Sequence, residues 1–322
     1  MRWASFFGAA LLIVLPAAAK PSLISASPVT FHQTDLSKTR QGPLRFVAGF
    51  ELTASADWFG GLSGMAMNEH GTMMRLVSDK AHWLDVLLAP DKQGVPTSFQ
   101  IRDHGALNVG GGVPLLSRLT DYDAEEVIDL SPKNDLTGPT LVSFERNDRL
   151  LAYTAPDASP VVKFKPSQSL VMNKGIEALA RLRDGRILML AEGTTDDAGL
   201  GLGWIADADF KRVDGLTYRR SGDFEPTAAA QLPDGDVLLL ERSYSPLAGV
   251  AMQLRRVPLS EIERGHLEGT IMVRLGGGYT IDNFEAMALH QRVDGTVLLY
   301  LISDDNFNPA QRTLFMVYAL DR

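Results

Sequence analysis

Residues 175–192 read Gly-Ile-Glu-Ala-Leu-Ala-Arg-Leu-Arg-Asp-Gly-Arg-Ile-Leu-Met-Leu-Ala-Glu. The Asp184-Gly185 pair is typical of a tight hairpin turn, because such turns need residues that accept positive φ values. Short apolar runs flank this pair on both sides, as in two paired β-strands. The stretch therefore predicts a β-hairpin with a carboxylate at each open end, Glu177 on the first strand and Glu192 after the second.

The same unit recurs along the chain. Residues 225–241 are the nearest copy, residues 284–304 repeat the pattern, and two looser copies start near Glu125 and Ser63. Successive copies are far enough apart for four strands and their turns. A repeat of this kind predicts an all-β protein with the β-propeller architecture.

The ring of this propeller needs a strand from the other end of the chain. The pattern gives five four-stranded blades, or six if residues 79–125 contain a degenerate blade. The last blade has only three strands after residue 284, whereas residues 45–52 form a strand without a blade. We expect this N-terminal strand to complete the last blade and close the ring, which removes exposed sheet edges.

Composition sets limits on the class of protein. The chain has 322 residues, of which 45% are hydrophobic and 22% charged, as in a globular protein with a large core. The net charge is −8 and no basic block is present, which argues against a nucleic-acid partner. The chain has no cysteine, so disulfides, thiolate metal sites and a cysteine nucleophile are excluded.

The N-terminus has the parts of a secretory signal peptide. Arg2 precedes a short apolar run that ends in Pro-Ala-Ala-Ala at residues 16–19. The run is too short to cross a bilayer core of about 30 Å, so no membrane span is expected after cleavage. We expect a signal peptide at residues 1–19, a linker or leading arm at 20–43, and a periplasmic or secreted propeller domain at 44–322.

Acids recur where first strands begin and second strands end. In a propeller the first strand of each blade lines the central channel, so both positions lie at one mouth of that channel. The predicted mouth acids are Asp79, Glu125, Glu145, Glu177, Glu192, Glu225, Glu241, Glu285 and Asp304. Crowded carboxylates raise one another's pKa, so this mouth requires compensating cations.

Two kinds of cation can compensate these acids. The internal candidates are Lys80, Arg146, Lys174 and Arg242, each next to one of these acids, and also Arg312. Of these, Arg146, Arg242, Arg312 and Lys174 could also bind an anionic substrate. The external candidate is Ca²⁺, because carboxylates are hard oxygen ligands and no soft ligand is present. Its expected ligands are Glu177, Glu225, Glu285, Asp304 and Asp305. Alternatively, the repeated acids are structural and bind backbone amides of neighbouring blades.

Several motifs resemble the bacterial phytase-like family, also described as esterase-like activity of phytase. They are Phe-Gly-Gly-Leu-Ser-Gly at 59–64, Gly-Ile-Glu-Ala-Leu-Ala at 175–180, Glu-Pro-Thr at 225–227, Asp-Asn-Phe-Glu at 282–285 and Ile-Ser-Asp-Asp-Asn-Phe at 302–307. The resemblance covers about residues 44–320. It implies a fold similar in kind to the β-propeller phytases, in which an acidic channel mouth holds Ca²⁺ and the substrate phosphate.

The pattern of acids and the resemblance together favour an exported hydrolase of phosphate or carboxylic esters. Its expected catalytic residues are Glu177, Glu225, Glu285 and Asp304, acting on a small anionic ester in a monomeric protein. The alternative is a non-catalytic periplasmic binding or scaffold propeller, in which the acids are structural.

Overall fold

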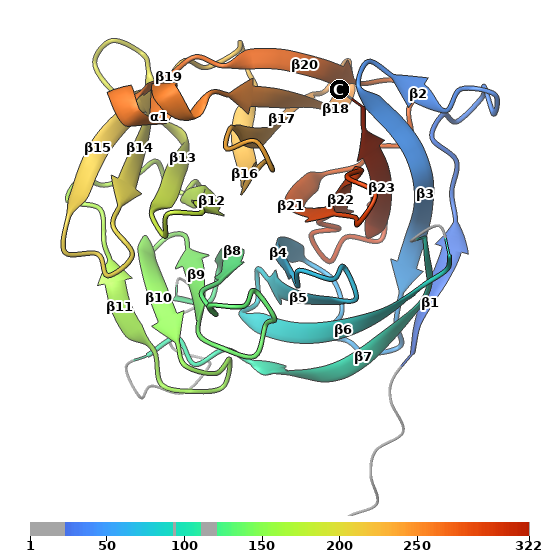
Figure 1. Ribbon diagram of the computed structural model, residues 1–322, viewed down its shortest axis with the longest axis horizontal. Coiled ribbons are helices and arrows are strands. Elements are labelled where there is room, and N and C mark those ends of the chain that lie inside the picture. The colour runs from blue at the N-terminus through green and yellow to red at the C-terminus, as the bar shows by residue number, and fades with distance from the viewer. Residues whose placement is uncertain (1–22, 93–94, 111–120, 322) are drawn as a thin grey trace, which may run out of the picture.

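The computed structural model describes residues 23–92, 95–110 and 121–321. The predicted signal peptide, residues 1–19, lies outside these ranges. The described residues form antiparallel β-sheets that surround a common centre, with one short helix, α1 (Leu259–Arg264) (Figure 1). Within the same ranges, no helix combines the length and apolar composition needed to cross a bilayer.

The described chain builds five blades, each a four-stranded antiparallel meander. The first three are β4 (Leu62–Met67), β5 (Met73–Ser78), β6 (His82–Pro90), β7 (Pro96–Ala106); β8 (Ala124–Asp129), β9 (Thr140–Phe144), β10 (Arg149–Tyr153), β11 (Val161–Phe164); and β12 (Ile176–Arg181), β13 (Ile187–Thr195), β14 (Gly201–Ala206), β15 (Val213–Tyr218). The last two are β16 (Glu225–Gln231), β17 (Val237–Ser245), β18 (Gly249–Val257), β20 (Thr270–Leu275); and β21 (Phe284–Gln291), β22 (Val297–Ser303), β23 (Leu314–Leu320), β3 (Leu44–Thr53). Two short strands, β2 (Arg40–Gln41) and β19 (His266–Leu267), pair with β3 and β15.

The ring closes as the sequence predicts. The N-terminal strand β3 pairs antiparallel with β23, so that Phe50 lies opposite Phe315 and Leu44 opposite Leu320. The innermost strands contact one another in ring order, including β21 of the last blade against β4 of the first. The five-bladed count is thus confirmed. The described residues between 79 and 125 provide β6 and β7 rather than a sixth blade.

A second connection joins the first and last blades. Strand β1 (Leu23–Pro28), in the segment expected to be a linker or leading arm, pairs with β3 on one side and β7 on the other. It places Ser25 opposite Thr53 and Ile24 opposite Phe99. The two blades therefore share one ten-stranded sheet, which covers the outer edges of both.

Packing between blades explains the residues of the innermost strands. These strands converge on the centre and are buried on both faces, as in β4 and β12. Small residues such as Ala178, Ala228 and Ala286 are fully buried there. At Gly64 a Cβ atom would lie 2.6 Å from the carbonyl oxygen of Glu125 in the next blade, so only glycine fits. The rigid channel that results holds the loops of its mouth in place.

Candidate active site

One backbone irregularity recurs in the innermost strand of every blade. The pairing with the second strand shifts register at one point, for example between Ile176 and Ala178 in β12. Such a β-bulge leaves a residue out of the ladder and redirects its side chain. The bulged residues of the five blades are Ser63, Glu125 with Glu126, Glu177, Thr227 and Glu285.

Four of these bulges contribute to a pocket of about 670 Å³ at the channel mouth. Its lining residues are Ser63, Asp79, Asp123, Glu125, Glu145, Arg146, Asn173, Glu177, Glu192, Arg242, Tyr244, Val250, Asp282, Asn283, Glu285, Asp304, Asn306, Asn308 and Gln311. Nine carboxylates therefore meet in one space. Seven of them belong to the nine mouth acids expected from the sequence.

The pocket brings together five of the predicted site residues. Glu177 and Glu285 reach it from the bulges of β12 and β21, and Asp304 follows the end of β22. Arg146 and Arg242 line the same space. These five side chains are therefore placed where one ligand could contact them together.

Glu225 and Glu241 do not reach the pocket, contrary to the expectation that all nine acids share the mouth. Glu225 lies two residues before its bulge, forms an ion pair with Arg220 and accepts a hydrogen bond from the Gly193 amide at 3.1 Å. Thr227 occupies the bulge instead and donates to the Phe284 carbonyl oxygen of the next blade at 3.3 Å. The pairing register of β16 thus moves Glu225 off the channel.

Glu241 is fully buried between strands of its own blade. It accepts hydrogen bonds from both Nε and Nη2 of Arg255 at 3.0 Å, and from Gln253 at 2.6 Å. Its side chain points away from the channel because alternate residues of a strand face opposite sides. This acid has the structural role that the sequence leaves open for each repeated carboxylate.

Asp305, Arg312 and Lys174 also lie outside the lining. The Asp305 carboxylate accepts hydrogen bonds from the Gly61 amide at 2.8 Å, the Phe307 amide at 3.0 Å and the Thr313 hydroxyl at 2.9 Å. Arg312 and Lys174 pair with acids that line the pocket: Arg312 with Asp282 at 3.6 Å and Lys174 with Glu192 at 3.0 Å. Asp305 therefore fixes the loop after β22, while the two basic residues position acids.

Two arginines face the acids from within the pocket. Arg146 lies 2.9 Å from Asp123 and 3.3 Å from Glu145, and its positive φ of 62° belongs to the turn after β9. Arg242 lies 3.2 Å from Glu285 and 3.9 Å from Glu192. Among the described residues, these two arginines and the paired Lys174 and Arg312 are fewer than the nine carboxylates, so the remaining acids must keep protons or bind a cation.

Burial and mutual repulsion raise the pKa of the pocket carboxyls. The pKa of Glu177 rises to about 8, because the group is buried and faces Glu192 and Glu145. Burial and the charge of Glu285 raise the pKa of Asp304 to about 8. Burial also raises the pKa of Asp79 and Glu285 to about 7 and that of Glu145 to about 8. In the absence of a bound cation, these groups keep much of their protons at neutral pH.

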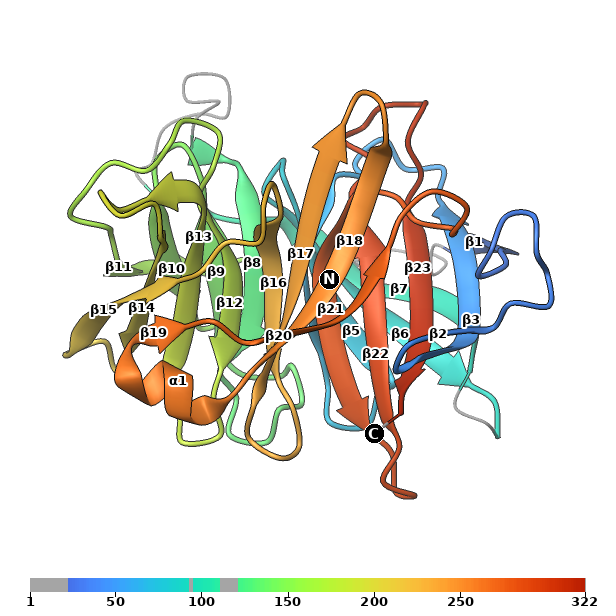
Figure 2. The same ribbon diagram turned by 90° about the horizontal axis from the view of Figure 1, so that it is seen from above.

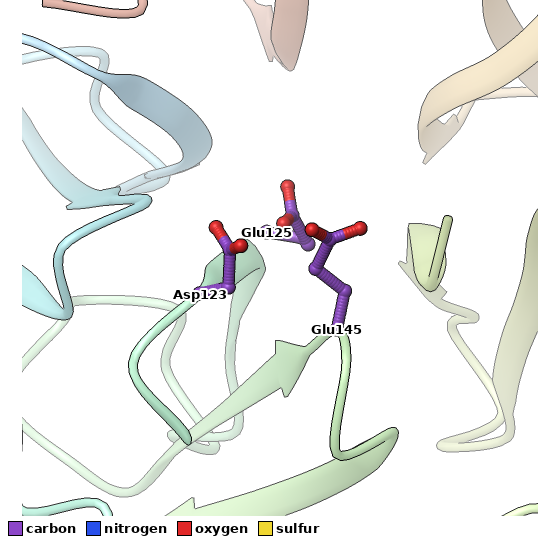
Figure 3. Close-up of side chains that lie close together, drawn as sticks. All are labelled: Asp123, Glu125 and Glu145. Atoms are coloured by element: carbon purple, nitrogen blue, oxygen red, sulfur yellow. The ribbon is translucent and has the colours of Figure 1, made fainter. Parts of the chain in front are cut away.

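The acids of the second blade form a cluster that could hold a metal ion. Asp123 precedes β8, Glu125 lies in its bulge, and Glu145 follows β9. Figure 3 shows their carboxylates directed into the same space. One oxygen from each lies within 4.8 Å of the others, and all three residues are buried. Beside them, Oδ1 of Asp79 is buried without a hydrogen-bond partner. Such a set of oxygens suits a hard divalent cation.

Asp123 and Asp282 are pocket acids that the sequence pattern does not select. The sequence does contain a signal for the position of the bulge, which is its distance from the Asp-Gly turn. Glu177 lies seven residues before Asp184, and Thr227 lies seven residues before Asp234. Aligned in this way, Asp123 lies two residues before a bulge, as Glu225 and Asn283 do. Asp123 and Asn283 line the pocket from this position, whereas Glu225 at the equivalent position does not.

The fold and this pocket define a five-bladed propeller with an acidic channel mouth. The model of the phytase-like family, described as "Esterase-like activity of phytase", matches residues 57–307. The chain therefore belongs to this family, as its motifs indicate. Comparison with curated proteins finds no match.

Several solved structures are similar to this chain. Hydrazine synthase of Kuenenia stuttgartiensis is 10% identical with a TM-score of 0.43, over 76% of this chain and 65% of the other. A glucose dehydrogenase is 13% identical with a TM-score of 0.45, over 80% and 96%. A gluconolactonase of Xanthomonas campestris is 13% identical with a TM-score of 0.42, over 95% and 99%.

Proposed function

We propose that this protein is an exported hydrolase of phosphate or carboxylic esters and that the acidic pocket is its active site. The observation that carries the proposal is the convergence of buried carboxyls of raised pKa with two arginines in one pocket. Perturbed titratable groups of this kind concentrate at functional sites. The family description names phytase and esterase-like activity, and on that basis we propose phosphate or carboxylic esters as the substrate class.

The pocket residues divide into three roles in this proposal. Asp123, Glu125 and Glu145 would hold Ca²⁺, because their oxygens converge within 4.8 Å. A bound cation there supplies an activated water and neutralises developing negative charge. Glu177 and Asp304, whose pKa is raised to about 8 in the cation-free protein by burial and neighbouring carboxylates, are the candidates to donate a proton to the leaving oxygen.

The arginines account for recognition of the anion. Arg242 is held by Glu285 and Glu192, and Arg146 by Asp123 and Glu145, so both guanidinium groups are fixed before a ligand arrives. Fixed guanidinium groups bind phosphate or an oxyanion in the forked geometry that these ligands favour. We accordingly propose that the substrate is a small anionic ester. We also propose that the protein acts as a monomer.

Hydrolysis assays test this proposal directly. Purified protein is incubated with phytate, p-nitrophenyl phosphate and p-nitrophenyl acetate, once with Ca²⁺ and once with a chelator. We expect turnover of at least one substrate, a strong decrease with chelator, and a loss of about 100-fold or more in Glu177→Gln. Asp294→Asn is the matched control, since this exposed acid lies in the turn that joins β21 to β22, remote from the pocket. Absence of turnover under all conditions would contradict the proposal.

The alternative function is a non-catalytic binding or scaffold propeller. Buried acids such as Glu241, which bind only protein groups, are the observation that favours it. Thermal melts with Ca²⁺ and with a chelator show whether the acids bind a cation, because a cation that binds only the folded state raises the melting temperature. A shift with Ca²⁺ but no turnover supports the binding protein, whereas no shift supports purely structural acids.

A further inference from the structure

The pocket is not uniformly polar, because one part of its rim carries apolar side chains. Of its nineteen lining residues, seventeen are acids, arginines, amides or serine. The other two are Tyr244 and Val250. The described part of the pocket therefore has one largely apolar region, and it comes from one element.

This element is the hairpin formed by β17 and β18. Tyr244 and Val250 lie directly opposite each other in its ladder, and the pairing continues outward to Ser245 and Gly249. Figure 2 shows the hairpin projecting from the ring on the side where β17 ends. Opposed side chains on one face of a ladder contact each other. The two residues thus form one small surface that the hairpin holds in a fixed position.

The tyrosine ring of this surface is accessible to a ligand. Tyr244 is 66% exposed, and Val250 is partly buried beside it. A tyrosine side chain offers a large, rigid apolar area at low cost in conformational entropy. A ligand in the pocket can therefore cover the ring without displacing other protein groups.

The apolar surface lies across the channel from the carboxylate cluster. The hairpin belongs to the fourth blade, whereas Asp123, Glu125 and Glu145 belong to the second. In ring order the third blade separates them on one side, and the fifth and first blades on the other (Figure 1). Because both sets of residues line one pocket, a ligand that has its charged group at the carboxylate cluster and is long enough to cross the pocket can reach Tyr244.

We propose that Tyr244 and Val250 form an apolar subsite and that the substrate is an ester with an aryl or similar apolar group. Its reacting group lies at the carboxylate cluster and its apolar group rests on Tyr244. This inference rests on the proposed function for the identity of the reacting group. A wholly polar polyol phosphate would leave the subsite uncovered, so the subsite favours aryl esters over such substrates.

Binding of two phosphonates tests the subsite without requiring turnover. Phenylphosphonate and methylphosphonate resist hydrolysis and resemble both a phosphate ester and the tetrahedral intermediate of a carboxylic ester. Calorimetric titration in Ca²⁺ should give about tenfold tighter binding of the phenyl compound. Tyr244→Ala should remove this preference and Tyr244→Phe should keep it. Leu247→Ala is the control on the same hairpin, because Leu247 is fully exposed and does not line the pocket.

Equal affinity for the two phosphonates, binding of neither, or a preference that persists in Tyr244→Ala would overturn the inference. Turnover of phenyl phosphate and phenyl acetate is measured separately on the same samples. A phenyl preference without turnover supports the subsite and contradicts the hydrolase. Turnover without a phenyl preference supports the hydrolase and contradicts the subsite.

Discussion

At the scale of single residues, the acids of this repeat lie in two different environments. Glu177 lies among other carboxylates in the pocket, whereas Glu241 is enclosed by Arg255 and Gln253. Burial penalises the charge of Glu177, but the ionised form of Glu241 is bound by a buried arginine. Two buried glutamates of the repeat, one in a first strand and one in a second strand, therefore affect stability in opposite directions when ionised.

This difference predicts opposite results for one substitution at two sites. At pH 8 without divalent cations, Glu177→Gln should stabilise the protein by about 1 kcal/mol or more, because it removes a repelled buried charge. Glu241→Gln should destabilise it by about 3 kcal/mol, because Arg255 loses its buried partner. Urea unfolding of both variants measures the two effects. A loss of stability in Glu177→Gln would show that its carboxylate is structural.

The sequence predicts which residue types gather at the mouth better than which individual residues do. Glu177, Glu285 and Asp304 lie in the pocket as expected, but Glu225 does not. Both Glu225 and Thr227 are near the start of the same strand, and a shift of two residues keeps a side chain on the same face. The location of the bulge, which depends on pairing with β17, distinguishes them. In the sequence it is marked by the seven-residue spacing between Thr227 and Asp234.

At the scale of elements, the bulged innermost strands hold the pocket in place through contacts between blades. One such contact is at Gly64 of β4, where an added Cβ would meet backbone atoms of Glu125, Glu126 and Val127 at 2.6 to 2.8 Å. Glu126 strengthens this contact, because its carboxylate accepts a hydrogen bond from the Met65 amide at 3.0 Å. The backbone of β8, which carries the carboxylate cluster, is thus located by β4.

Gly64→Ala should therefore damage stability and activity together. The added methyl group must push β8 away from β4, a change that costs about 1–3 kcal/mol in a packed core. Gly215→Ala in β15 is the matched control, because its Cβ would meet nothing within 4 Å. Urea midpoints and hydrolysis rates of the two variants check this. Equal behaviour of both variants would mean that β8 is not held by this contact.

The sequence predicts the strands of the blades well, but it does not predict strand β1. Alternating or fully apolar runs with Asp-Gly turns identify the blade strands, because burial and turn geometry are local properties. The segment 23–28 is short and contains serine and proline, and its apolar residues show no clear periodicity. Their strand conformation comes from pairing with β3 and β7, which are distant in sequence.

At the scale of the whole molecule, the acidic mouth makes stability depend on pH and on cations. The folded-state pKa values of Glu177, Asp304 and Glu145 are near 8, above the ordinary values of 3.8 to 4.5. Their contribution to stability is complete below about pH 4 and is lost as pH rises toward 8, because the unfolded chain releases these protons first. Without a cation, folding is therefore weakened at neutral and alkaline pH.

We expect the free energy of unfolding to decrease from pH 5.5 to pH 8.5 in the presence of a chelator. Added Ca²⁺ should reduce this decrease, because a bound cation favours the ionised carboxylates. Urea titrations at the two pH values, each with Ca²⁺ and with chelator, measure the effect. Stability that rises with pH in chelator would contradict the assignment of raised pKa values to the mouth.

The pairing of β3 with β23 also dictates the order in which the protein can fold. These strands lie near opposite ends of the described chain, so during synthesis the edge of β3 that pairs with β23 stays open until almost all of the protein has been made. Contacts of such long sequence separation form slowly. We expect the last blade to assemble late, and the closed ring, once complete, to open slowly because no blade can leave it without breaking this seam.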